Sequence, residues 1–234
     1  MGAIPAENPN VDSGALASEL HRSATAVVDT GVRFERGTER PLGAKGRRTR
    51  AVILRGARRA FTELGWTGTT VGEVAARAGV GAGTIYQYFR SKTELLAALV
   101  GESTLAALDQ IRAWDPAAGP DGLRELIGAF VQGYARTAPM QAVWEEVSLV
   151  EPELAALRRD LTEVYVGLFA DALAAGGELG ILDPGPDPRE TARALCAMVD
   201  RYCNQAFVHD FVSTDADAAS ELLTRLWTAA IRMA

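Results

Sequence analysis

Apolar residues recur every three or four positions along most of this chain, a spacing that is typical of amphipathic helices. The first clear stripe lies between residues 47 and 65 and consists of Ile53, Leu54, Ala57, Ala60, Phe61 and Leu64. Gly65 follows it, and glycine commonly ends a helix because it adopts left-handed backbone conformations without strain. The pattern predicts a first helix over 47–65.

Two shorter helices are predicted directly after it. Thr70 and Glu73 form a Thr-x-x-Glu capping box, in which both side chains bind free amides of the first helical turn. The helix that it starts ends at Gly79, and the tight turn Gly81-Ala82-Gly83 leads into a short helix over 84–89. The order helix, turn, helix is therefore expected within residues 70–89.

A second capping box, Ser91 to Glu94, begins a helix that extends to about residue 114. Pro, Gly and Asp residues, which commonly begin or end helices, then divide the remaining apolar pattern into five further helices. These are predicted over 121–137, 139–150, 153–176, 188–211 and 216–232. Residues 1–44 are polar, with one short candidate helix around Leu16 to Val28, and are expected to form a mostly flexible arm. No internal repeat and no convincing strand is found, so the predicted fold class is all-α.

Composition agrees with a helical globular protein. Hydrophobic residues make up 48% of the 234, enough for a real core, and aromatic residues only 7%. Cys196 and Cys203 stand seven residues apart, which on a helix is about 10 Å and too far for a disulfide. They are expected to be buried apolar residues in a reducing compartment. No apolar signal segment and no membrane-length run is present, so a cytoplasmic protein without a membrane partner is expected.

Charge is distributed very unevenly along the chain. Residues 45–100 carry ten Lys and Arg against three acids, whereas residues 101–234 carry ten Arg against twenty-one acids. A basic module joined to an acidic body favours a polyanion-binding domain over 45–92 and a second, helical domain over 93–234.

The basic module resembles the tetracycline-repressor (TetR) family of DNA-binding regulators. The resemblance rests on Thr69-Thr70-Val71, Ala78-Gly79-Val80 and the run Thr84-Ile85-Tyr86-Gln87-Tyr88-Phe89-Arg90-Ser91-Lys92, with Phe61 and Gly65-Trp66 upstream. Gly81 departs from the family, which commonly has Ser or Thr there, so a hydroxyl contact to phosphate is not expected at that position. The resemblance implies a three-helix DNA-binding domain followed by a variable helical domain for ligand binding and dimerisation.

The resemblance also implies which residues meet DNA. Thr84, Tyr86 and Tyr88 would face the duplex, Gln87 would contact a base edge and Lys92 a phosphate, while Ile85 and Phe89 pack inward. The basic cluster just before the first helix is expected to touch DNA as an arm. The predicted set is Lys45, Arg47, Arg48, Arg50, Thr70, Thr84, Tyr86, Gln87, Tyr88 and Lys92. The plain alternatives are that Tyr86 and Tyr88 only pack the domain and that Gln87 is only solvated.

For the acidic domain, the resemblance implies a homodimer and a small-molecule effector that is apolar or aromatic with a polar group. Candidate effector contacts are Phe130, Tyr134, Trp144, Tyr165, Phe169, Tyr202 and Phe207, and the plain alternative for each is that it only packs the core. Candidate dimer contacts are Leu195, Met198, Val199, Leu222, Leu226 and Trp227. A repressor released by its effector is the expected mode, with the helix from Ser91 as the lever between the domains.

Two other classes of function were weighed. An enzyme is disfavoured because His21, His209 beside Asp210, and Glu145-Glu146 form no metal-ligand, nucleophile or phosphate-loop motif; no metal and no cofactor is expected. A purely architectural nucleic-acid binder without an effector fits the basic module equally well and differs only in the second domain.

Overall fold

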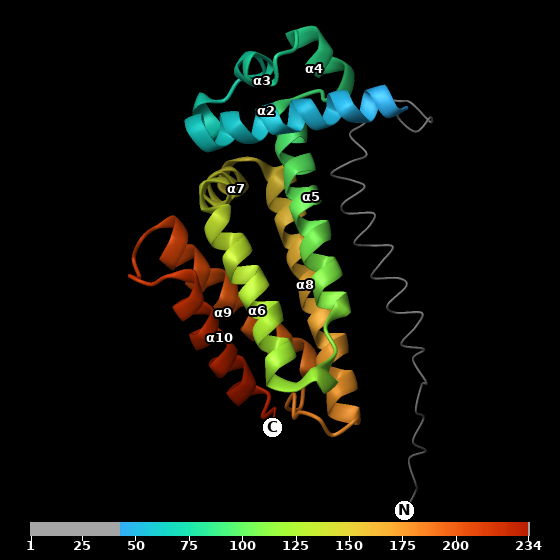
Figure 1. Ribbon diagram of the computed structural model, residues 1–234, viewed down its shortest axis with the longest axis vertical. Coiled ribbons are helices and arrows are strands. Elements are labelled where there is room, and N and C mark those ends of the chain that lie inside the picture. The colour runs from blue at the N-terminus through green and yellow to red at the C-terminus, as the bar shows by residue number, and fades with distance from the viewer. Residues whose placement is uncertain (1–42, 234) are drawn as a thin grey trace, which may run out of the picture.

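The computed structural model describes residues 43–233, and within that range the chain is helical without strands, as predicted (Figure 1). The candidate helix near Leu16 to Val28 and the rest of residues 1–42 lie outside the described residues. The elements are α2 (Ala44–Gly68), α3 (Val71–Ala78), α4 (Ala82–Tyr88), α5 (Lys92–Ala113), the 3-10 turn η1 (Pro116–Ala118), α6 (Gly119–Arg136), α7 (Ala138–Val150), α8 (Pro152–Glu178), α9 (Pro188–Cys203), the π-helical turn η2 (Asn204–Val208) and α10 (Ala216–Ala230).

The helices form a small head on top of a longer body. Figure 1 shows α2 lying across the upper end of the body, with α3 and α4 above it and α5 descending from the head beside α8. Helices α9 and α10 cover the side of the body opposite to α5. One basic module thus sits at the end of a helical bundle.

The predicted capping residues set the helix boundaries in both parts. The Thr70 hydroxyl accepts the Glu73 N–H at 3.1 Å, and the Ser91 hydroxyl accepts the Glu94 N–H at 3.2 Å. Gly79 ends α3 with a left-handed φ of 67°. Only the glutamates differ from the prediction: Glu94 accepts the N–H of Arg90 and Glu73 pairs with Arg77, because those partners lie within reach of the carboxylates.

Helix α2 begins earlier and is less regular than predicted. It starts at Ala44, so the basic cluster from Lys45 to Arg50 lies on its first turns and not on an extended arm. Gly65 interrupts it with a φ of 66°. Leu64, predicted to face the core, is 37% exposed, because the stripe turns away from the core at the end of the helix.

Two main apolar cores hold the molecule together. The head core contains Ile53, Phe61 and Ile85, all fully buried, and it extends into α7 through Met140, Val143 and Val147. The body core joins residues of α6, α8, α9 and α10 around Phe169 and Trp227. Helix α7 belongs to the head core and packs against α2, so it connects head and body in addition to α5, the helix expected to act as the lever.

The helix predicted over 188–211 is shorter than expected. It ends at Cys203 and continues as η2, after which His209 to Asp215 form an irregular loop. Insertion of a π turn changes the direction of the side chains that follow, which the apolar spacing alone does not show. No helix within 43–233 combines the length and apolarity needed to cross a membrane.

Candidate nucleic-acid interface

Helix α4 is held by two apolar anchors that leave its polar edge open. Ile85 is fully buried and Phe89, directly after the helix, is 5% exposed, as the four-residue spacing predicted. Gly81 supplies the carbonyl that binds the N–H of Thr84 at 2.9 Å, so a glycine suffices to begin the helix. Tyr86 is 52% exposed and Gln87 is also exposed. Helix α4 therefore exposes hydrogen-bond donors and acceptors along about one helical turn.

Thr84 and Tyr88 are less open than Tyr86. Both are half-buried, and Tyr88 packs partly against the head core. A half-buried tyrosine keeps its ring in the core and its hydroxyl near the surface. Tyr88 therefore has the packing role that had been its alternative, and its contact with DNA stays a prediction.

The other predicted DNA contacts differ in how far they are exposed. Lys45, Arg47, Arg48 and Thr70 are exposed. Arg50 donates to Glu102 of α5 at 3.2 Å, and its guanidinium lies 5.6 Å from the centre of the Phe89 ring. Arg50 thus ties α2 to α5, and its contact with DNA stays a prediction.

Lys92 is also engaged inside the head. Its ammonium donates to the carbonyls of Trp66 at 2.9 Å and Thr69 at 3.3 Å. An ammonium has three N–H groups, so one remains for a phosphate. The phosphate contact stays a prediction, and a structural role that the sequence did not indicate is added to it.

The predicted effector residues fall on two different cores. Tyr134 and Phe169 are buried in the body core, and Phe130, Tyr165, Tyr202 and Phe207 pack against it. Trp144 instead packs against the head core from α7, so it does not share a core with the other six. Apolar periodicity placed Trp144 on an inward face but could not show which core that face meets.

Trp114 and Trp227 were not singled out as effector contacts, although they flank Phe169. The ring centres lie 6.2 Å apart for Trp114 and Phe169 and 5.0 Å apart for Phe169 and Trp227. Within the part of the chain described, neither indole N–H has a hydrogen-bond acceptor, although both atoms are buried. Buried donors without partners are uncommon and mark a place where an acceptor would be stabilising. Only the folded arrangement reveals such a pair.

The predicted dimer residues are corrected in part. Leu195 and Val199 are each 6% exposed and Trp227 is 1% exposed, because they pack in the core of their own subunit. These three cannot contribute appreciable surface to a partner. Met198 and Leu222 are half-buried and Leu226 is 42% exposed, so they keep surface that a second subunit could cover.

A polar cluster links α7 to the π turn. The Glu145 carboxylate accepts the Asn204 amide at 2.9 Å and lies 2.9 Å from Nε2 of His209. The hydrogen bond from Asn204, followed by that from His209, lowers the pKa of Glu145. The adjacent Glu146 accepts the Thr67 hydroxyl of α2 at 3.3 Å. Neighbouring residues of α7 thus contact the head and the π turn of the body.

Comparison with known proteins identifies the same module. Residues 53–99 match the family model described as bacterial regulatory proteins, tetR family. The HTH-type transcriptional regulator BetI 2 of Chromohalobacter salexigens is 30% identical over 161 residues, which cover 64% of this chain and 73% of the relative. The HTH-type transcriptional repressor BepR of Brucella suis is 26% identical over 175 residues, covering 69% of this chain and 82% of BepR.

Solved structures agree over most of the chain. SmeT, the repressor of the Stenotrophomonas maltophilia multidrug efflux pump SmeDEF, superposes with a TM-score of 0.65 at 26% identity, covering 78% of this chain and 89% of SmeT. A complex of SmeT with triclosan gives a TM-score of 0.66 at 25% identity, over 78% and 91% of the two chains. The relatives are transcriptional regulators, which confirms that the prediction of a regulator and not an enzyme was right.

Proposed function

This chain belongs to the TetR family of bacterial regulatory proteins, and from that premise we propose that it is a homodimeric repressor released from its operator by a small apolar or aromatic effector. The proposal assigns residues 45–92 to DNA binding, residues 93–234 to effector binding and dimerisation, and residues 1–44 to an arm, in a cytoplasmic protein. BepR and SmeT are both named as repressors, which favours repression over activation.

One observation carries the DNA-binding part: α4 exposes Tyr86 and Gln87 while Ile85 is fully buried. A short helix with a fixed inner face and an open polar edge can enter a major groove. Glutamine can form two hydrogen bonds with adenine, and tyrosine hydroxyls commonly contact the phosphate backbone. Exposed Lys45, Arg47 and Arg48 on the first turns of α2 would neutralise neighbouring phosphates.

A homodimer is supported by the surfaces that α9 and α10 leave open. Met198, Leu222 and Leu226 retain exposed apolar surface on these helices. A two-fold pairing through them would present two α4 helices to one duplex, as helix-turn-helix dimers do.

The aromatic residues of the body core support an effector that is apolar but carries a hydrogen-bond acceptor. Tyr134 and Tyr165 bring hydroxyl groups into this core, and burial raises the pKa of Tyr134 and raises that of Tyr165 to about 12. The unpaired indole N–H groups of Trp114 and Trp227 add two further donors beside Phe169. SmeT binds triclosan, an aromatic compound, and we propose a ligand of that class here. The effector would act through its different affinities for the DNA-binding and released states.

The DNA-binding part is tested by selecting bound fragments from genomic DNA and measuring affinity for the selected duplex by mobility shift. Gln87→Ala should weaken binding by about 5- to 150-fold, the loss of about 1–3 kcal/mol expected for a base contact, with an unchanged melting temperature. Ile85→Ala is the contrasting variant and should lower stability by about 2–5 kcal/mol because the side chain is buried. Unaltered affinity in both Gln87→Ala and Tyr86→Ala would exclude α4 as the reading helix.

The effector part is tested with triclosan as the probe. Binding should be measurable by calorimetry, should weaken the protein–DNA complex, and should decrease in Trp114→Phe, which keeps an aromatic ring but removes the N–H. Phe61→Leu in the head core provides a matched core substitution and should not change triclosan affinity. Triclosan that binds without altering DNA affinity would contradict the proposed release mechanism.

A further inference from the structure

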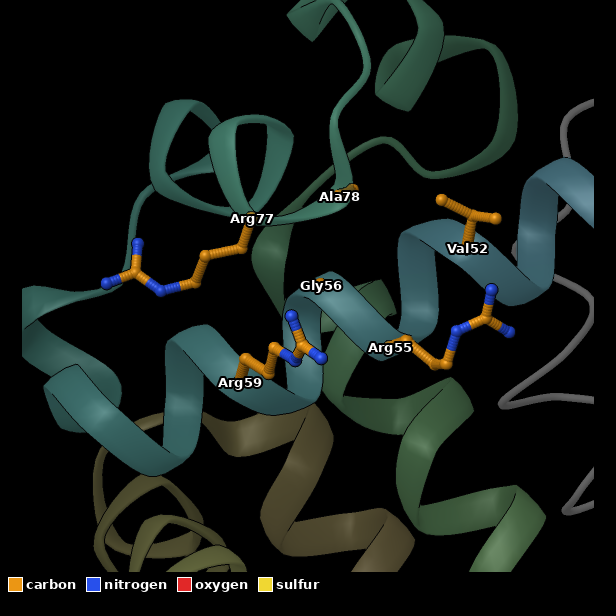
Figure 2. A pocket seen from close by; sticks show the side chains of 6 residues that line it. All are labelled: Val52, Arg55, Gly56, Arg59, Arg77 and Ala78. Atoms are coloured by element: carbon orange, nitrogen blue, oxygen red, sulfur yellow. The ribbon is translucent and has the colours of Figure 1, made fainter.

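The flank of the head carries a groove that the contact of α4 with DNA does not use. The groove lies between α2 and α3, has a volume of about 200 Å³, and is lined by Val52, Arg55, Gly56, Arg59, Arg77 and Ala78 (Figure 2). Its wall is thus formed by three arginines and three small or apolar residues.

The floor of the groove is set by a close approach of two helices. A Cβ atom added to Gly56 would lie 2.7 Å from the Cβ of Ala78 and 2.8 Å from its backbone nitrogen. Because neither residue has a side chain beyond a methyl group, α2 and α3 meet almost backbone to backbone. The three arginines of the wall therefore surround a floor that two tightly packed helices hold rigid.

The charges around this floor are not balanced. Arg77 donates to Glu63 at 2.9 Å and also pairs with Glu73, so both of these acids are engaged by one guanidinium. Glu63 stands one helical turn after Arg59 and would be its ordinary partner. Among residues 43–233, no hydrogen bond or ion pair involves the guanidinium of Arg55 or of Arg59.

Arg55 and Arg59 are exposed and one helical turn apart, so their charges are neighbours on α2. Such a like-charged pair destabilises a helix unless an anion neutralises it. Figure 2 shows both side chains on the open side of α2 beside the groove, with Arg77 reaching from α3. The arrangement favours an anion that can accept from two guanidinium forks.

We propose that this groove is a phosphoryl-binding site, with Arg55 and Arg59 as the donors and Arg77 as a fixed wall. A planar guanidinium group can donate two parallel hydrogen bonds to two oxygens of one phosphate. This geometry suits an anion with several oxygens better than a single spherical ion. A volume of about 200 Å³ is below the range of about 300–1,000 Å³ for drug-sized ligands, so the occupant is a phosphate or diphosphate group and not a whole nucleotide.

Two sources supply such a group: a small phosphorylated compound, or backbone phosphates of DNA beyond the segment that α4 contacts. The second source rests on the proposed function, whereas the first does not. Either source would bind through Arg55 and Arg59. Variants of these two arginines therefore test whether the groove binds a phosphoryl group, and two separate measurements distinguish the sources.

The first measurement uses pyrophosphate as the probe. The melting temperature of the full-length protein is compared in sodium pyrophosphate and in sodium chloride at equal ionic strength. Binding should raise the melting temperature by about 3 °C at a saturating concentration. The increase should be lost in Arg55→Gln and in Arg59→Gln. Arg58→Gln is the matched control, since it removes one charge from the same helix outside the groove, and it should retain the increase.

The second measurement uses the selected duplex, either trimmed to the segment that two α4 helices span or extended by about ten base pairs, one turn, on each side. If DNA is the source, the extended duplex should bind at least threefold more tightly. The salt dependence of that binding should decrease by about one unit of slope for each of Arg55→Gln and Arg59→Gln.

A response in either measurement that depends on Arg55 and Arg59 but not on Arg58 supports the site and identifies its source. No such response in both, or equal losses in Arg58→Gln, overturns it. Weak binding of Gln87→Ala to the trimmed duplex, measured in parallel, shows whether the proposed function itself holds.

Discussion

The ammonium of Lys92 lies 4.1 Å from the centre of the Trp66 ring and donates a 2.9 Å hydrogen bond to the carbonyl of the same residue. A second bond from Lys92 reaches the carbonyl of Thr69. Lys92 is the first residue of α5, whereas Trp66 lies in the last turn of α2 and Thr69 directly follows that helix. One side chain thus joins the first helix of the head to the helix that leads into the body.

Lys92→Met should lower the free energy of unfolding by about 1–3 kcal/mol, because it removes both carbonyl contacts and the cation–ring interaction but keeps the alkyl chain. Urea denaturation followed by tryptophan fluorescence measures the change. Arg48→Met, an exposed residue on the first turns of α2, is the control and should change stability by less. A stability of Lys92→Met equal to that of the unaltered protein would leave DNA contact as the role of this lysine.

Gly56→Ala should destabilise the head by about 1–3 kcal/mol, since the new methyl group overlaps both the side chain and the backbone of Ala78. Chemical denaturation gives the value. Gly128→Ala in α6 is the matched control, because nothing lies within 4 Å of its added Cβ. That variant should be stabilised by about 0.5–1 kcal/mol through helix propensity. The two substitutions are chemically identical, so opposite signs would isolate the helix contact.

The two cysteines should resist thiol reagents in the folded protein. Both are free, and burial raises the pKa of Cys196 and of Cys203 to about 12. At pH 8 so few thiolates exist that modification should be about a thousandfold slower than in the denatured chain. A chromogenic disulfide reagent, used with and without denaturant, measures both rates. Rapid reaction of the native protein would show that this part of α9 opens in solution.

Glu145→Gln should lower stability at pH 7 but have little effect at strongly acidic pH. The pKa of Glu145 is lowered below its ordinary 4.5 by the hydrogen bonds from Asn204 and His209, so the folded state favours the charged carboxylate. Such a group contributes stability above its unfolded pKa and loses it as the pH falls through the folded value. Thermal melts between pH 7 and pH 3 follow the difference between the two proteins.

Glu125→Gln, on the exposed surface of α6, serves as the control for charge alone. If Glu145→Gln and Glu125→Gln change stability equally at every pH, the contact between α7 and the π turn contributes nothing.

The sequence by itself determined the features that depend on neighbouring residues. Thr70, Gly79 and Ser91 set the ends of the head helices through contacts within four residues, and the inward positions of Ile85 and Phe89 follow from helical spacing. The sequence alone likewise shows that the head is basic and the body acidic. It also shows that the head resembles the TetR family. These features depend only on residues close together in the sequence, so the sequence is enough to predict them.

Tertiary structure alone decided which surfaces meet. Leu195, Val199 and Trp227 were expected to contact a partner subunit, but they pack in the core of their own subunit. Apolar spacing could not show that Trp144 packs with the head, or that Lys92 and Arg50 form hydrogen bonds with residues of other segments. Helical periodicity fixes the direction of a side chain relative to its own axis, whereas its neighbours depend on how separate helices pack, which residues far apart in the sequence determine together.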